Sequence, residues 1–130
     1  MTKLEEARIF FAQDRYAVEA TGCMIEELDE KYAKCSLQLE RRHYNAVGQV
    51  MGGVAFTLAD FAFAVATNFQ QVLTVSVTSQ ICYLGTVKGT ALIAETRLIK
   101  DGKRNCFYEV DVTDNLGNRI ALVSITGAHL

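Results

Sequence analysis

The chain has 130 residues and a formal charge of −2, and half of its residues are apolar. This length is typical of one domain, and the apolar share is sufficient for a sizeable core. Both signs of charge are mixed along the chain, so it shows neither a basic footprint for nucleic acid nor a polybasic membrane segment. No signal-peptide pattern stands at the start, and no stretch reaches the roughly 20 apolar residues of a membrane span, so we expect a cytoplasmic protein.

The cysteines are widely separated along the chain: Cys23, Cys35, Cys82 and Cys106. None belongs to a C-x-x-C pair or stands near a histidine at ligand spacing, so we expect neither a zinc site nor a redox pair. The simpler prediction is free thiols buried in a protein from a reducing compartment.

The N-terminal third of the chain predicts a helix followed by a β-hairpin. Apolar residues recur at helical spacing over Leu4–Ala17, and Gly22 ends this segment. A short strand is expected over Cys23–Leu28, and the turn that follows it is formed by Asp29-Glu30. Apolar and polar residues then alternate over Tyr32–Glu40, which is typical of a half-buried strand.

The middle of the chain predicts a loop that leads into one long helix. Arg41–Val50 has no periodicity. After Met51-Gly52-Gly53, a pattern of Ala, Phe and Leu continues to Asn68. This pattern indicates a helix of about 15 residues.

The second half of the chain predicts strands separated by turns. β-branched and alternating stretches occur over Val72–Leu84, Gly89–Lys100, Arg104–Thr113 and Asn118–Thr126. Asp101-Gly102 is a strong hairpin turn, and Asp114–Asn118 forms another. We therefore expect these four strands to form a meander.

The order of these elements predicts an α+β fold in a single domain over residues 1–130. Because helices and strands do not alternate in βαβ units, the sheet should be antiparallel. The central helix is apolar nearly all round, so the economical arrangement wraps a curved sheet of five to six strands around it, with an additional N-terminal helix.

Asp60 is the most conspicuous residue of the central helix. Its helical neighbours include Phe56, Thr57, Phe61 and Ala64. Burial of an unpaired carboxylate costs several kcal/mol or raises its pKa. The sequence therefore marks Asp60 as a candidate catalytic acid or base, although an Asp that faces a gap in the packing and pairs with a Thr, Asn or backbone donor would fit the same pattern.

The glycine pair at the start of this helix indicates an anion-binding position. Gly52 and Gly53 would expose backbone N–H groups at the positive end of the helix dipole, with no Cβ to exclude a ligand. Such donors can form an oxyanion hole. Asn45 and Gly48 lie in the loop that would form the wall of this site, where Asn45 either orients a polar group or caps a turn.

The loop and the helix together carry one motif: His43-x-Asn45-x-x-Gly48-x-x-Met51-Gly52-Gly53, then Thr57-Leu58-Ala59-Asp60. This motif resembles that of the hotdog-fold acyl-CoA thioesterases of the phenylacetate-pathway (PaaI-like) type. Their pattern is N-x-x-G-x-x-H-G-G with an Asp seven residues after the second Gly. The resemblance covers essentially the whole chain. It implies a hotdog fold and hydrolysis of an acyl-CoA to a carboxylic acid and coenzyme A, with no metal and no other cofactor.

The resemblance also assigns catalytic roles. The Gly53 amide would hold the thioester carbonyl oxygen, and Asn45 would help to place the thioester or the water. Asp60 would act as a general base on water, or as a nucleophile that forms an anhydride. Ser76 matches a position where a hydroxyl supports the attacking water, although it is equally well a residue on the polar face of a strand.

Substrate contacts are expected around these groups. We predict that Gly52, Met51 and Thr57 contact the substrate. Met51 stands where the family usually has His, and a thioether can neither donate a hydrogen bond nor carry a proton. Basic side chains at strand ends are the candidates for the coenzyme A phosphates: Lys88, Lys103 and Arg104. Each of these is otherwise an ordinary residue of a solvated rim.

The spacing of Gly53 and Asp60 predicts an oligomer. Seven residues of one helix span about 10.5 Å at 1.5 Å per residue. An Asp side chain is too short to reach from there to a carbonyl carbon about 3 Å from the Gly53 amide. We therefore predict a homodimer with composite sites, in which one protomer supplies Asn45 and Gly53 and the other supplies Asp60 and Ser76. The resemblance implies that two dimers pair into a homotetramer.

Two other functions stay open. Met51 favours a non-catalytic hotdog protein that binds acyl-CoA as a sensor or carrier. A dehydratase acting on acyl-carrier protein would pair a His with an acid, and His43 is the only histidine of the loop. The sequence does not name the acyl group, because the same aromatic residues fit core packing or a pocket lining: Phe56, Phe61, Phe63 and Tyr83.

Overall fold

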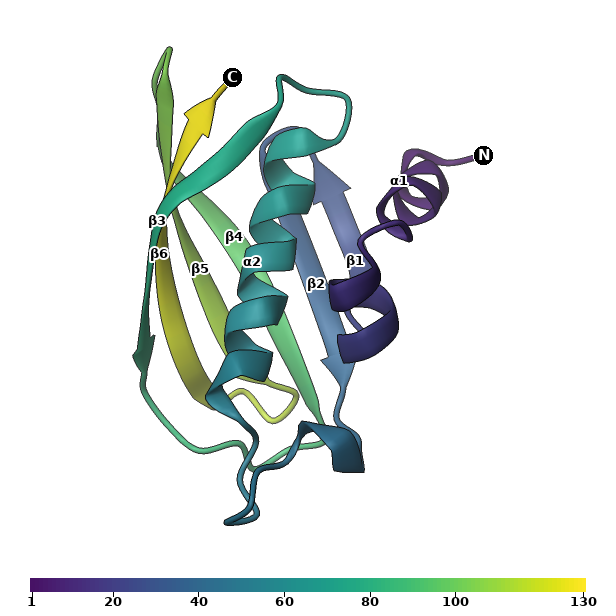
Figure 1. Ribbon diagram of the computed structural model, residues 1–130, viewed down its shortest axis with the longest axis vertical. Helices are drawn as coiled ribbons and strands as arrows, with labels where there is room; N and C mark the ends of the chain where they lie inside the picture. Colours follow the sequence, from purple (N-terminus) through teal and green to yellow (C-terminus); the bar gives the residue numbers. More distant parts are fainter.

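The computed structural model describes all 130 residues. One long helix lies in the concave face of a single antiparallel sheet (Figure 1). The helices are α1 (Lys3–Phe11) and α2 (Gly52–Asn68), with a π-helical turn η1 (Tyr16–Thr21) and a 3-10 turn η2 (Arg41–His43). The strands are β1 (Met24–Asp29), β2 (Tyr32–Gln38), β3 (Thr74–Tyr83), β4 (Ala91–Asp101), β5 (Asn105–Asp114) and β6 (Arg119–His129). The expected wrapping of a sheet around a central helix is confirmed.

Helix α2 forms the centre of the core. Leu58, Ala62 and Val65 have no exposed surface, and Phe61 and Phe63 are almost completely buried. Burial of each large apolar side chain contributes about 1.5–3 kcal/mol, so the sheet-facing side of α2 holds the helix in place. No helix of the structure is both long and apolar enough to cross a membrane.

Strand periodicity decides which side chains reach this core. In β5, Cys106, Tyr108, Val110 and Val112 are buried on one face, as their spacing predicted. The alternation over β2 is likewise confirmed. The expected buried thiols are confirmed for Cys23, Cys35 and Cys106, whereas Cys82 is exposed because it lies on the outward side of an edge strand.

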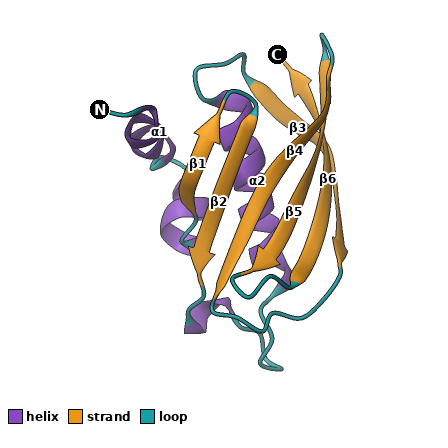
Figure 2. Ribbon diagram, turned by 180° about the vertical axis from the view of Figure 1, so that it is seen from behind, coloured by secondary structure: helices purple, strands orange, loops and turns teal.

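The prediction of a four-strand meander is wrong for β3. The sheet has the order β1-β2-β4-β5-β6-β3, which Figure 2 shows from behind. Strand β3 pairs only with β6 and forms one edge, while β4 takes the free side of β2. After β3, the connection therefore leads from the edge of the sheet next to β6 to the position of β4 next to β2. A curved sheet that encloses a helix allows this connection, and local sequence patterns do not report it.

The prediction of one helix over Leu4–Ala17 is also wrong in extent. Helix α1 ends at Phe11, and a turn leads into η1. Gly22 ends η1 in the left-handed region at φ 95°, where a residue without Cβ is favoured. The break at Ala12–Arg15 matters because it brings the second segment against α2.

Candidate active site

The first turn of α2 presents unpaired backbone donors. Met51 is the N-cap residue, and it adopts extended backbone angles without a side-chain cap. The N–H groups of Gly52 and Gly53 have no acceptor within the chain, whereas that of Val54 bonds to the Met51 carbonyl at 3.0 Å. Free donors at the positive end of a 17-residue helix favour an anionic oxygen.

Two side chains lie close to the glycines of this turn. A Cβ on Gly52 would lie 2.6 Å from the phenolic oxygen of Tyr83, so a larger residue there would displace the end of that ring. A Cβ on Gly53 would lie 3.6 Å from the methyl carbon of Met51, an ordinary contact. The two glycines therefore serve different purposes: Gly52 admits Tyr83, and Gly53 leaves its amide open.

The loop before α2 is ordered by Asn45. Its side-chain oxygen accepts hydrogen bonds from the N–H groups of Val47 (3.0 Å) and Gln49 (3.1 Å). Its backbone N–H donates to the Gln49 carbonyl at 2.7 Å, and Gly48 takes φ 79°. The side-chain oxygen of Asn45 therefore caps the turn, as one of the two predicted roles requires. The side-chain nitrogen of Asn45 makes no hydrogen bond within the chain.

His43 has a structural role in this loop. Its side chain is 3 % exposed, its Nδ1 accepts from the Glu40 N–H at 2.8 Å, and its Nε2 lies 2.7 Å from the Thr21 carbonyl. Both ring nitrogens are thus engaged with backbone, and the ring ties η1 to the loop. This leaves His43 without the access to substrate that a dehydratase would require.

Asp60 lies on the open side of α2 and not in the core. Its side chain is partly exposed, in a groove between α2 and the segment from Asp14 to Ala17, with Phe56 in the wall. The expectation of a buried, unpaired carboxylate is therefore wrong for the protomer. Desolvation in the groove and the neighbouring charge of Asp14 nevertheless raise the pKa of Asp60 above its ordinary value.

The groove brings in two residues that sequence reasoning missed. Asp14 has a pKa raised by desolvation and lies beside Tyr16 on the same wall. Arg15, the cation of the groove, pairs with Glu19 at 3.6 Å. The sequence holds no signal for these two residues, because the π-helical turn that begins at Tyr16, of a kind that frequently occurs at functional sites, is seen only in the structure.

One stripe of α2 carries both proposed catalytic groups. Gly53, Thr57, Asp60 and Ala64 are exposed or half-buried, at the spacing of one helical face. The Thr57 hydroxyl donates to the Gly53 carbonyl at 2.8 Å, so this group is used within the helix. Gly53 and Asp60 share the face but remain about 10.5 Å apart along the axis.

Ser76 lies on β3, the edge strand. It pairs with Gly127 next to a bulge, and its side chain is exposed. The outer side of this strand has no pairing partner in the chain. Ser76 is therefore presented at a sheet edge and not beside Asp60 of the same protomer.

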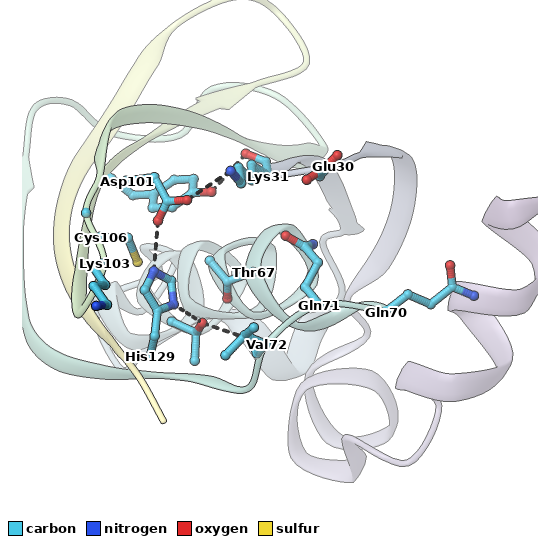
Figure 3. Close-up of a pocket in the computed structure, with 13 residues that line it drawn as sticks. Glu30, Lys31, Thr67, Gln70, Gln71, Val72, Asp101, Lys103, Cys106 and His129 are labelled. Carbon is cyan, nitrogen blue, oxygen red and sulfur yellow. Dashed lines mark hydrogen bonds and ion pairs between the residues drawn. The ribbon is translucent and has the colours of Figure 1, made fainter.

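Lys103 and Arg104 lie at the far end of the molecule from Gly53. They belong to the hairpin between β4 and β5, beside the C-terminal end of α2 (Figure 1). There Lys103 lines a cavity of about 420 Å³ together with Gln71 and His129 (Figure 3). Within one protomer the structure does not bring Lys103 and Arg104 to the Gly53 amide. The third predicted cation, Lys88, lies on the connection between β3 and β4, at the same end of the molecule as Gly53.

The same cavity contains the one cluster with metal-ligand chemistry: Asp101, Cys106 and His129, with ligand atoms within 4.8 Å of one another. Asp101 and His129 are already paired with other groups. Asp101 bonds Lys31 Nζ at 2.9 Å and His129 Nε2 at 2.8 Å, while His129 Nδ1 lies 2.8 Å from the Thr74 hydroxyl (Figure 3). The cluster therefore acts as a connection between β4, β6 and the β1–β2 turn.

The sequence also matches known proteins. Residues 47–121 match the family model described as the thioesterase superfamily. A putative esterase of Archaeoglobus fulgidus is 29 % identical over 124 residues, covering 95 % of this chain and 80 % of that protein. The acyl-coenzyme A thioesterase PaaI of Escherichia coli is 28 % identical, covering 91 % of this chain and 84 % of PaaI.

Solved structures show the same fold. The E. coli PaaI structure superposes with a TM-score of 0.84 at 24 % identity, covering 98 % of this chain and 96 % of that one. A hypothetical thioesterase protein of Streptococcus pneumoniae, solved with coenzyme A, gives a TM-score of 0.83 at 20 % identity, covering 92 % of this chain and 96 % of that one. These likenesses confirm the hotdog fold.

Proposed function

The chain belongs to the thioesterase superfamily and is a thioester hydrolase, and on that premise we propose that it hydrolyses an acyl-CoA with Asp60 and the Gly53 amide as its catalytic groups. The observation that carries this proposal is the open stripe of α2, which holds unpaired N–H donors at one end and a carboxylate of raised pKa two turns further on. The PaaI relative and the fold neighbour solved with coenzyme A support the choice of acyl-CoA.

The proposed chemistry begins at the carbonyl oxygen. The Gly53 N–H donates a hydrogen bond to this oxygen, which gains negative charge as the tetrahedral intermediate forms. The carbonyl carbon thereby becomes a better electrophile. Carbonyl polarisation and an activated water suffice for this reaction, so we propose that it proceeds without a metal or redox cofactor.

Asp60 activates the water. As the water oxygen bonds to the carbonyl carbon, the carboxylate accepts a water proton. The intermediate then collapses, the C–S bond breaks, and the thiolate leaves and takes up a proton. A carboxylate with a raised pKa is a stronger base than an ordinary one, which suits this role. A mixed anhydride on Asp60 is the alternative. If water attacks the Asp60 carbonyl of this anhydride, single turnover in ¹⁸O-water puts label into Asp60, whereas the general-base route puts label only into the acid product.

We propose that each site is composite. Asp60 and Gly53 of one protomer are too far apart to act on one thioester, whereas an antiparallel second copy places Asp60 and Ser76 of one chain near Gly53 and Asn45 of the other. The unpaired edge of β3, with Val75 and Val77 exposed, is where such a copy would pair. In such a composite site, Lys103 and Arg104 of the second copy would be close enough to bind the coenzyme A phosphates. Two such dimers would form the predicted tetramer.

The test is a thiol-release assay over a panel of acyl-CoA substrates with the variant Asp60→Asn. This change keeps the side chain's size and removes its basicity, so kcat should fall by about 10³-fold or more. Asp111→Asn, a matched change on the outer face of β5, should keep normal turnover. If Asp60→Asn were equally active, the proposal would be wrong.

The same assay addresses the binding-protein alternative. Thermal stabilisation by acyl-CoA without thiol release from any member of the panel would indicate a sensor or carrier.

Mixing inactive Asp60→Asn with inactive Gly53→Pro chains tests the composite site, because hybrid dimers contain one intact site and should regain activity. A fully active monomer at high dilution would contradict the composite site.

A further inference from the structure

The side chain of Tyr83 ends at the start of α2. Tyr83 is the last residue of β3 and pairs with Ala121 of β6, and the next N–H, of Leu84, bonds the Ile120 carbonyl at 2.8 Å. Its backbone is therefore fixed by the sheet. The phenolic oxygen lies 2.6 Å from the position of a Cβ on Gly52, so the hydroxyl reaches the backbone of the first helical turn.

This hydroxyl has no partner in the chain. The tyrosines Tyr32 and Tyr108 donate to Glu95 Oε2 at 2.6 Å and to the Lys31 carbonyl at 2.9 Å, whereas no hydrogen bond satisfies Tyr83. Its side chain is 56 % exposed, so the hydroxyl is not enclosed by the chain. The N–H groups of Gly52 and Gly53, in the helical turn that the hydroxyl reaches, also lack acceptors.

The other side chain at this turn supplies no donor. The thioether end of Met51 lies beside Gly53 and cannot donate a hydrogen bond. Of Met51 and Tyr83, only Tyr83 has an O–H or N–H group to offer. A phenol donates a hydrogen bond without giving up its proton at neutral pH, which is the property needed beside a developing oxyanion.

We propose that Tyr83 is a further catalytic residue, which donates its phenolic hydrogen bond to the same thioester oxygen as the Gly53 amide. The inference rests on the proposed function of this site. In the tetrahedral intermediate the carbonyl oxygen carries the negative charge, and the N–H and the O–H stabilise it from two directions. Tyr83 keeps its proton throughout, and when the C–S bond breaks the oxygen returns to a carbonyl.

The test uses Tyr83→Phe, which retains the ring on Gly52 and removes only the oxygen. Loss of one oxyanion donor costs about 10²-fold or more in kcat. We expect a decrease of that order with KM within about twofold, since the donor acts mainly on the transition state. The matched control is Tyr32→Phe, which removes a hydroxyl bonded to Glu95 on β4 and should leave thiol release unchanged.

A second measurement separates catalysis from packing. A trifluoromethyl ketone analogue of acyl-CoA adds water to form a tetrahedral gem-diol, whose oxygen can occupy the position of the oxyanion, whereas free coenzyme A has no such group. Tyr83→Phe should weaken binding of the ketone by the same factor as kcat/KM and leave binding of coenzyme A unchanged. A purely structural role would weaken both ligands or neither.

The outcomes distinguish this inference from the function on which it rests. If Asp60→Asn is inactive and Tyr83→Phe turns over at the normal rate, Tyr83 is not catalytic and the proposed function stands. If Asp60→Asn is active, the proposed function itself fails. A double variant, Met51→His with Tyr83→Phe, should recover part of the kcat that Tyr83→Phe loses, because the imidazole places an N–H donor beside Gly53. If the double variant folds normally and kcat does not rise, Tyr83 and the Gly53 amide do not share an oxyanion position.

Discussion

At the C-terminal end of α2 the polar groups have partners within the chain, whereas at the N-terminal end the backbone donors have none. The Asn68 side chain bonds both the N–H (2.7 Å) and the carbonyl (3.0 Å) of Thr74, and Gln71 donates to the Ala66 carbonyl at 2.9 Å. The neighbouring network of Lys31, Asp101 and His129 is likewise paired. Gly52 and Gly53 have no such partners.

This contrast separates a structural site from a functional one. Hydrogen-bonding groups that are already paired have little to offer a ligand, so the network of Asp101 and His129 is part of the scaffold. An end with unpaired donors leaves them to solvent until an acceptor arrives. A thioester oxygen is such an acceptor. Variants at the open end should therefore change turnover, and variants of the paired network at the other end should change stability.

Among variants that compare the two ends of α2, the largest effect is expected from Gly53→Pro. Proline is tolerated in the first helical turn but removes the N–H, so kcat should fall by about 10²–10³-fold with a small change in melting temperature. Gly53→Ala keeps the N–H and places its Cβ 3.6 Å from the flexible end of Met51, so it should lose less. Equal losses in the two variants would show that bulk, and not the amide, is what matters.

A moderate effect, on stability alone, is expected from Asp101→Asn at the satisfied end. The hydrogen bonds from Lys31 and then His129 lower the pKa of Asp101, against the opposing effect of burial. A lowered folded-state pKa stabilises above the unfolded value of about 3.9, and this contribution is lost as the pH falls through the folded value.

Asp101→Asn should therefore lower the free energy of unfolding by about 1 kcal/mol at pH 7. Its melting temperature should approach that of the native protein in acid, where Asp101 is protonated in both states of the native chain. Calorimetry from pH 7 to pH 3 measures this, with thiol release recorded in parallel. A large loss of turnover would break the distinction between the two ends.

The smallest effect is expected from Asp14→Asn, in the groove between the two ends. Desolvation and the Asp14 charge raise the pKa of Asp60, and a base must be ionised to act, so activity falls as the pH drops through that pKa. Removing the charge of Asp14 should move the acidic limb of the kcat/KM profile to lower pH. The control Asp14→Glu keeps the charge, so the acidic limb of its kcat/KM profile should stay near the native position. If the acidic limb of Asp14→Asn does not move either, Asp14 does not influence the catalytic carboxylate.

The sequence by itself determined the elements and the motif. Patterns that span a few residues predicted α2 and the strands, because side-chain periodicity follows directly from helix and strand geometry. The Gly-Gly entry and the position of Asp60 on the same helix were equally local. Spacing along one helix also sufficed to show that Gly53 and Asp60 do not meet within a protomer.

Only the tertiary structure decided which distant residues come together. The crossing of β3 to the edge beside β6 depends on the curvature of the whole sheet, and it carries Tyr83 to Gly52, 31 positions earlier in the chain. The break between α1 and η1 sets Asp14 beside Asp60, and the β4–β5 hairpin sets Asp101 beside His129. Such contacts depend on packing between elements far apart in sequence, for which a short stretch of residues has no periodic signal.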